Sequence, residues 1–116
     1  MKIKLSEIIN GEKNIASLQE VKLPVKISYR IKRLVDKLIP ILKNYQEEKN
    51  KLVIEFGEKL EEDKYEVTDP IKLKEFWAKV TELQEIEEEI DFEKIKVEEL
   101  GNINIEPKLL LDFIFE

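Results

Sequence analysis

The stretch from residue 23 to residue 57 reads LPVKISYRIKRLVDKLIPILKNYQEEKNKLVIEFG, and it predicts the longest element of the fold. Its apolar side chains return in steps of three and four, which is the period of a helix that buries one stripe. Pro24 suits a first helical turn, and Gly57 suits the position just after a helix end. Pro40 removes one backbone hydrogen bond, so we expect a kink or a break there. The expected stripe is Ile27, Ile31, Leu34, Leu38, Ile41, Tyr45, Leu52 and Phe56.

A second helix is expected to return along the first. The polar stretch Glu58–Thr68 reads as a small hairpin, with Glu61-Glu62-Asp63-Lys64 as its turn. Asp69-Pro70 then has the residue types of a helix cap and first turn. Because the connection is short, the two helices should pack antiparallel. The apolar positions of the second helix are Leu73, Phe76, Trp77, Val80, Leu83 and Ile86.

Two similar four-residue sequences lie near the two ends of the chain, Lys2-Ile3-Lys4-Leu5 and Lys94-Ile95-Lys96-Val97. Both alternate apolar and charged residues, as half-buried strands do, so we expect them to pair in one small sheet. Short helices are expected at 14–21 and 108–115. The predicted fold class is therefore α+β and mostly α. It consists of an antiparallel helical hairpin, with a long kinked helix and a shorter one, and a small sheet formed by the N- and C-terminal segments.

Composition narrows the class of protein further. A length of 116 residues with 42% hydrophobic content fits a single domain, 1–116. Cysteine and histidine are absent, which excludes disulfides, thiolate nucleophiles and histidine acid–base catalysis. No apolar run approaches the roughly 18 residues that span a bilayer, and charged residues interrupt the beginning of the chain. We therefore expect a soluble protein, made in a cytoplasm, with no membrane partner.

The net charge of −6 is unevenly distributed. Residues 22–51 hold nine Lys/Arg against three Asp/Glu, and residues 58–99 hold seven against sixteen. The first interpretation is that a basic row on the long helix pairs with an acidic row on the second helix and fixes their register. Two alternatives stay open, and direct nucleic-acid binding is the less favoured of them because the pI is near 4.9. The other is that the acidic stretch imitates a phosphate backbone. The basic row is Lys26, Arg30, Arg33 and Lys37, and the acidic residues are Glu82, Glu85, Glu88 and Glu89.

Catalytic patterns are weak. Carboxylates three apart at Glu55–Glu58 and Glu88–Asp91 have the spacing of the magnesium ligands in all-α nucleotide pyrophosphatases. The first pair, however, is interrupted by Gly57, and such spacings arise by chance in a sequence rich in Glu. No base accompanies a serine, and no glycine-rich loop could hold a phosphate. We expect neither an enzyme nor a cofactor.

Three stretches together resemble an uncharacterised family of small proteins that phages and prophages of Gram-positive bacteria encode. They are LPVKISYRI at 23–31, YQEEKNKL at 45–52 and EIDFEKIKV at 89–97. The resemblance implies a viral protein that works in the host cytoplasm or in the virion. It implies no functional residue, because no activity or site is assigned to that family.

The hypothesis from sequence is a phage-encoded, non-enzymatic protein–protein interaction protein, serving particle assembly or host takeover. Its partner would be a phage or host protein, or a second copy in a homo-oligomer. The expected contact surface is apolar and includes Phe113 and Phe115 at the C-terminal tip. The alternative is an acidic inhibitor that blocks a host nucleic-acid-binding or defence protein through Glu82, Glu85, Glu88 and Glu89.

Overall fold

The expected long helix, α2, runs from Val25 to Phe56 in the computed structural model, which describes residues 1–62 and 64–116. It ends where the Gly57 amide donates to the Val53 carbonyl at 2.8 Å. Pro40 lies inside α2, and the helix continues through it, so the break that the sequence allowed does not occur. The predicted stripe is buried at Ile27, Ile31, Leu34, Leu38 and Tyr45 and half-buried at Ile41, Leu52 and Phe56.

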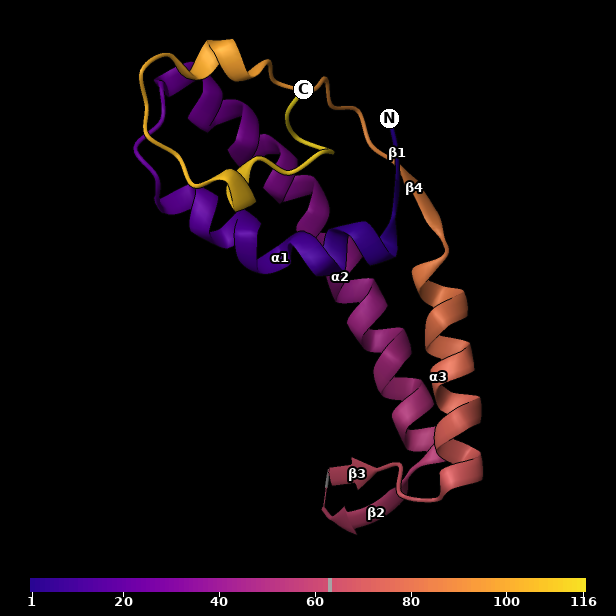
Figure 1. The fold of residues 1–116 in the computed structure, drawn as a ribbon. Coiled ribbons are helices and arrows are strands. Elements are labelled where there is room, and N and C mark those ends of the chain that lie inside the picture. The colour runs from indigo at the N-terminus through magenta and orange to yellow at the C-terminus, as the bar shows by residue number, and fades with distance from the viewer. Residues whose placement is uncertain (63) are drawn as a thin grey trace.

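Beyond α2 the chain turns back through a hairpin into a helix. Strands β2 (Glu58–Glu61) and β3 (Lys64–Glu66) pair antiparallel, and Asp63 of the predicted turn lies outside the described residues. Helix α3 spans Pro70–Gln84 and is capped by Asp69, whose carboxylate accepts from the Ile71 and Lys72 amides at 2.9 and 3.3 Å. Figure 1 shows α3 beside the C-terminal half of α2, which it contacts.

The N-terminal helix is longer than the sequence suggested. Strand β1 covers only Lys2–Lys4, and α1 then spans Leu5–Glu20 instead of beginning at residue 14. Gly11 lies inside α1 and is buried beneath the Phe113 ring. A Cβ at Gly11 would lie 3.2 Å from the Phe113 ring, so the small residue makes room for the C-terminal segment. The buried apolar residues of α1 are Leu5, Ile8, Ile15 and Leu18.

The predicted strand pairing is wrong. Strand β1 pairs antiparallel with β4 (Glu87–Glu89), so that Lys2 lies opposite Glu89 and Lys4 opposite Glu87. Opposite charges across this ladder favour the observed partner. In the stretch 94–97, Ile95 makes a parallel bridge to Phe115, and Val97 begins a short 3₁₀ helix, Val97–Leu100.

The C-terminal stretch also differs from its prediction. The expected helix at 108–115 is a single 3₁₀ turn, Pro107–Leu109, after which the chain turns inward. The Ile95 amide donates to the Ile114 carbonyl at 2.8 Å, and the Glu116 amide donates to the Ile95 carbonyl at 3.0 Å. The last apolar residues therefore complete the main core. The buried residues among them are Leu109, Phe113, Ile114 and Phe115.

The molecule has two visibly different parts (Figure 1). A body contains α1, the N-terminal half of α2 and the C-terminal segment. An arm contains the C-terminal half of α2, β2, β3 and α3. The radius of gyration is 17.6 Å, against about 13 Å for a compact chain of this length, and the extents are 52 × 26 × 22 Å. The fold is mostly helical with two small antiparallel sheets, which confirms the predicted class.

Candidate protein-interaction surfaces

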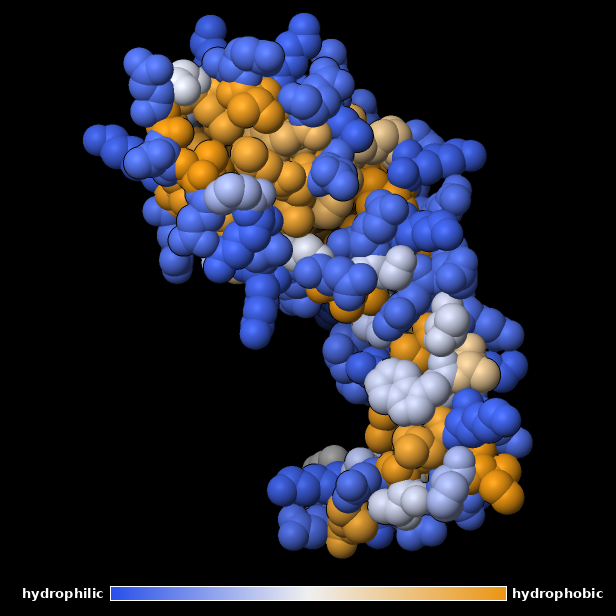
Figure 2. Space-filling model, viewed as in Figure 1, coloured by the Kyte–Doolittle hydropathy of each residue, from blue (hydrophilic) through white to orange (hydrophobic). Residues whose placement is uncertain are grey.

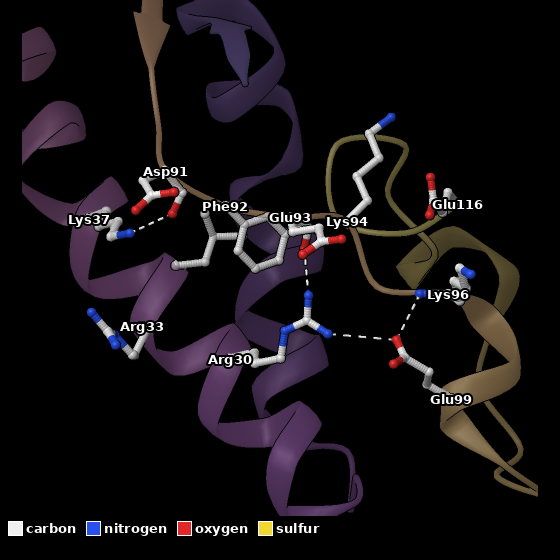
Figure 3. Close-up of a pocket in the computed structure, with 11 residues that line it drawn as sticks. Arg30, Arg33, Lys37, Asp91, Phe92, Glu93, Lys94, Lys96, Glu99 and Glu116 are labelled. Atoms are coloured by element: carbon white, nitrogen blue, oxygen red, sulfur yellow. Dashed lines mark hydrogen bonds and ion pairs between the residues drawn. The ribbon is translucent and has the colours of Figure 1, made fainter.

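Two members of the basic row of α2, Arg30 and Lys37, contact the segment 91–99 rather than α3. The Arg30 guanidinium donates to the Glu93 carbonyl at 2.6 Å and lies 3.6 Å from the Glu99 carboxylate. The same guanidinium lies over the Phe92 ring, 5.9 Å from its centroid. Lys37 donates to the Asp91 carbonyl at 2.5 Å. Figure 3 shows these side chains reaching across from α2 to the extended segment.

These contacts surround a hollow of about 500 Å³, and their role is structural. The basic groups supply hydrogen bonds to carbonyls that no sheet or helix satisfies, so they fasten the segment 91–99 to the body. Arg33 is exposed and points away from Arg30 in Figure 3. Positive and negative groups alternate around the hollow, because Asp91, Glu93, Glu99 and Glu116 also line it.

The predicted pairing of the two charged rows is wrong. Glu82 instead lies 3.8 Å from Lys79 on its own helix, and Glu85 lies 3.5 Å from Lys4. Glu89 lies 3.1 Å from the ammonium of Met1. The contacts of Glu85 and Glu89 tie the end of α3 and strand β4 to the N-terminus, while Arg30 and Lys37 hold the segment 91–99.

The four acidic candidate residues lie close together but differ in exposure. Glu82, Glu85 and Glu89 are exposed, whereas Glu88 is half-buried opposite Ile3 in the β1–β4 ladder.

Elsewhere, a side-chain hydrogen bond to Glu48 raises the pKa of exposed Lys51 above its usual 10.5. Within residues 1–62 and 64–116 no group of three or more acidic side chains is arranged to hold a metal ion.

The C-terminal tip is not an exposed contact surface, which corrects the prediction for Phe113 and Phe115. Their exposed fractions are 8% and 5%, and Ile114 between them is fully buried. The tip is buried because α1 leaves space at Gly11 and because the segment around Ile95 hydrogen bonds to it. These side chains belong to the core and are not available to a partner.

Exposed apolar side chains lie on the arm as well as on the body. Figure 2 shows apolar surface over the body and also along the arm, which contains α3, the C-terminal half of α2 and the β2–β3 hairpin. Trp77 is 50% exposed, and the Lys49 ammonium lies 5.8 Å from its ring centroid. All four residues of β2 are exposed, and Leu60 among them is 57% exposed. A hollow of about 570 Å³ lies between α2 and the hairpin. Its lining includes Asn50, Val53, Ile54, Leu60 and Tyr65.

Sequence reasoning missed this arm face, which we define as Val53, Leu60, Tyr65 and Trp77. The period of α3 placed Trp77 in the same apolar stripe as Phe76. In the structure Phe76 is 5% exposed and Trp77 is 50% exposed, and the planes of the two rings are inclined by 68°. An available signal was Leu60, which is the one apolar residue in the polar run 58–64.

Comparisons with protein-family models, with curated proteins and with solved structures return no match. Among the residues that the structure describes, no helix combines the length and apolar character needed to span a membrane.

Proposed function

We propose that this chain is a phage-encoded, non-enzymatic protein–protein interaction protein that binds a phage or host protein through the arm face. It would act in the host cytoplasm or in the virion, in particle assembly or in host takeover. The observation that supports the proposal is the placement of large apolar side chains on a two-helix arm, outside the main core. Isolated exposed apolar residues are ordinary, but a contiguous apolar patch is typical of a contact surface.

The geometry of the arm suits a partner that inserts apolar side chains. The hollow beside Leu60 and Tyr65 is large enough for several side chains, and the Asn50 amide lies at its edge. On the same arm, the Lys49 ammonium of α2 lies over the half-exposed Trp77 ring of α3. Aromatic anchors of this kind contribute a large share of the binding energy in protein interfaces.

We expect Leu60→Asp to reduce recovery of a specific partner from infected cells by about tenfold or more, because it places a charge in the centre of the apolar contact. Affinity capture with quantitative mass spectrometry measures this. The matched control is Val97→Asp, which changes a 41% exposed apolar residue on the body and should leave recovery unchanged. If both variants lower recovery of the partner equally, or if neither lowers it, the arm face is rejected as the binding surface.

The second candidate function is an acidic inhibitor of a host nucleic-acid-binding or defence protein. It is supported by the exposed carboxylates of Glu82, Glu85 and Glu89 at the end of α3 and along β4. Against it, each of the three already has a basic group of the same chain within 4 Å.

This second candidate predicts that replacing Glu82, Glu85, Glu88 and Glu89 by Gln abolishes inhibition of the target without loss of fold. The exposed ion pairs are worth about 0–1 kcal/mol each, so the melting temperature should fall by only a few degrees. Inhibition assays and thermal melts of the same samples separate the two effects. Unchanged inhibition by the neutral variant, or no inhibition by the native chain, would reject this candidate.

A further inference from the structure

The outward side of α2 carries a second regular row of residues. It lies opposite the buried stripe and advances in steps of three and four, except at its centre, where Ile39 and Pro40 are adjacent. Four of the large apolar side chains that the structure leaves exposed are on it, at 85% for Val25, 61% for Tyr29, 56% for Ile39 and 55% for Ile54. We call it the outer row. Its members are Val25, Tyr29, Lys32, Asp36, Ile39, Pro40, Lys43, Glu47, Asn50 and Ile54.

The outer row is complementary to itself when reversed. If two copies of α2 lie antiparallel about a twofold axis between Ile39 and Pro40, residues at equal distances from the axis face each other. Each opposed pair then joins an apolar residue to an apolar one, a charge to its opposite, or an aromatic residue to an amide. The pairs are Val25 with Ile54, Tyr29 with Asn50, Lys32 with Glu47, Asp36 with Lys43 and Ile39 with Pro40.

We infer that a second copy of this chain covers the outer row and forms an antiparallel α2–α2 dimer. The charges support the occupant and its direction. In the single chain Lys32 lies 3.4 Å from Asp36, and both side chains are more than half exposed. Among the described residues, no ion pair occupies Lys43 or Glu47. The partner's Lys43 and Glu47 extend that pair into a row of four alternating charges, and the twofold axis forms this row twice.

The length of α2 suits this contact. A helix of 32 residues is about 48 Å long, and the longest dimension of the molecule is 52 Å, so the row runs along almost the whole molecule. The β2–β3 hairpin lies beside the C-terminal end of the row, where Asn50 and Ile54 line a hollow with Leu60 and Tyr65. Near the axis a hollow of about 370 Å³ lies between α1 and α2, and Leu23, Val35 and Ile39 line it. It gives the partner's central residues an apolar surface to contact. A single helix pair is a small interface, so we expect a dissociation constant on the order of tens of micromolar.

The inference goes beyond the proposed function, because the outer row and the arm face are different surfaces. Asn50 and Ile54 border both surfaces and are therefore not used in any test. A chain that captures a partner through Leu60 but stays monomeric would reject the dimer alone. A dimer that captures nothing would reject the proposed function alone.

The first experiment is sedimentation equilibrium of the full chain and its variants. We expect Ile39→Glu to raise the dissociation constant at least about tenfold, because it places two carboxylates at the axis. The matched control is Ile71→Glu, which changes a 73% exposed residue on α3 outside the row and should leave the constant unchanged. Circular dichroism confirms that each variant is folded. A native chain that stays monomeric to about 0.5 mM, or a control as damaging as Ile39→Glu, overturns the inference.

The second experiment tests the antiparallel direction. In the proposed dimer residue 36 faces Lys43 of the partner, so Asp36→Lys opposes two positive charges and should weaken the dimer about threefold to tenfold. Adding Lys43→Asp to the same chain reverses both charges and should restore native affinity or better. Because the chain has no cysteine, Val25→Cys can carry a single spin label. The two labels should lie about 44 Å apart in an antiparallel dimer, whereas a parallel dimer would bring them within about 15 Å. The short distance, or no rescue by the charge swap, overturns the inference.

Discussion

Deletion of residues 113–116 is expected to unfold the body. The deletion removes Phe113, Ile114 and Phe115, whose exposed fractions are all 8% or less. Truncating one such side chain costs about 2–5 kcal/mol, so losing three approaches the roughly 5–15 kcal/mol that a domain of this size has in total. The deletion also leaves the Ile95 amide without its acceptor. NMR should show that the chemical-shift dispersion of α1 is lost, and a thermal melt should no longer be cooperative. Both results would report that the body is unfolded.

The control for this deletion is Ile71→Ala, because Ile71 is exposed and touches no core cluster. It should change the free energy of unfolding by no more than about 0.5 kcal/mol. A truncated chain that melts cooperatively at the native temperature would contradict the buried position of the tip. It would restore the hypothesis from sequence that Phe113 and Phe115 face a partner.

The long helix could be predicted from sequence because its signal is long and redundant. Over eight turns a buried stripe must recur in steps of three and four, and residues such as Ile31, Leu34 and Leu38 repeat it. The cap of α3 was predictable for a local reason, since Asp69 and Pro70 each suit a helix start independently of tertiary contacts.

The strand pairing could not be predicted in the same way. A three-residue strand has one buried side chain, here Ile3, and a Lys-x-Lys word suits any acidic or apolar strand as partner. The choice of Glu87–Glu89 over 94–97 follows from tertiary structure. Helix α1 begins directly at Leu5, whose amide donates to the Ile86 carbonyl at 2.9 Å and sets the register.

The candidate site was only partly predictable for a related reason. An apolar C-terminal run is equally consistent with a buried tip and with an exposed one, and Gly11, far away in sequence, decides the outcome by leaving room for Phe113. The role of Arg30 depends on backbone carbonyls of residues 91–99, and no sequence pattern identifies those. The arm face depends on which of two adjacent aromatic residues, Phe76 or Trp77, is buried.

Phe76→Ala is expected to unfold the arm while the body stays folded. Phe76 is 5% exposed, and with Val80 it forms a buried contact separate from the main core. Removing a buried aromatic side chain costs about 3–5 kcal/mol, and the arm has few other buried residues to compensate. Hydrogen exchange measured by NMR should show lost protection along α3 (Pro70–Gln84), with protection retained around Ile8 and Leu34.

Trp77→Ala is the matched control, because it truncates the neighbouring aromatic residue, which is half exposed. It removes the Lys49 contact and should cost about 1 kcal/mol or less, which leaves α3 protected. The two variants together separate a folding role from a binding role on adjacent residues. If Phe76→Ala instead removes protection from α1 and α3 equally, the arm and the body unfold as one cooperative unit. In that case the arm face could not be altered through its buried residues without losing the whole fold.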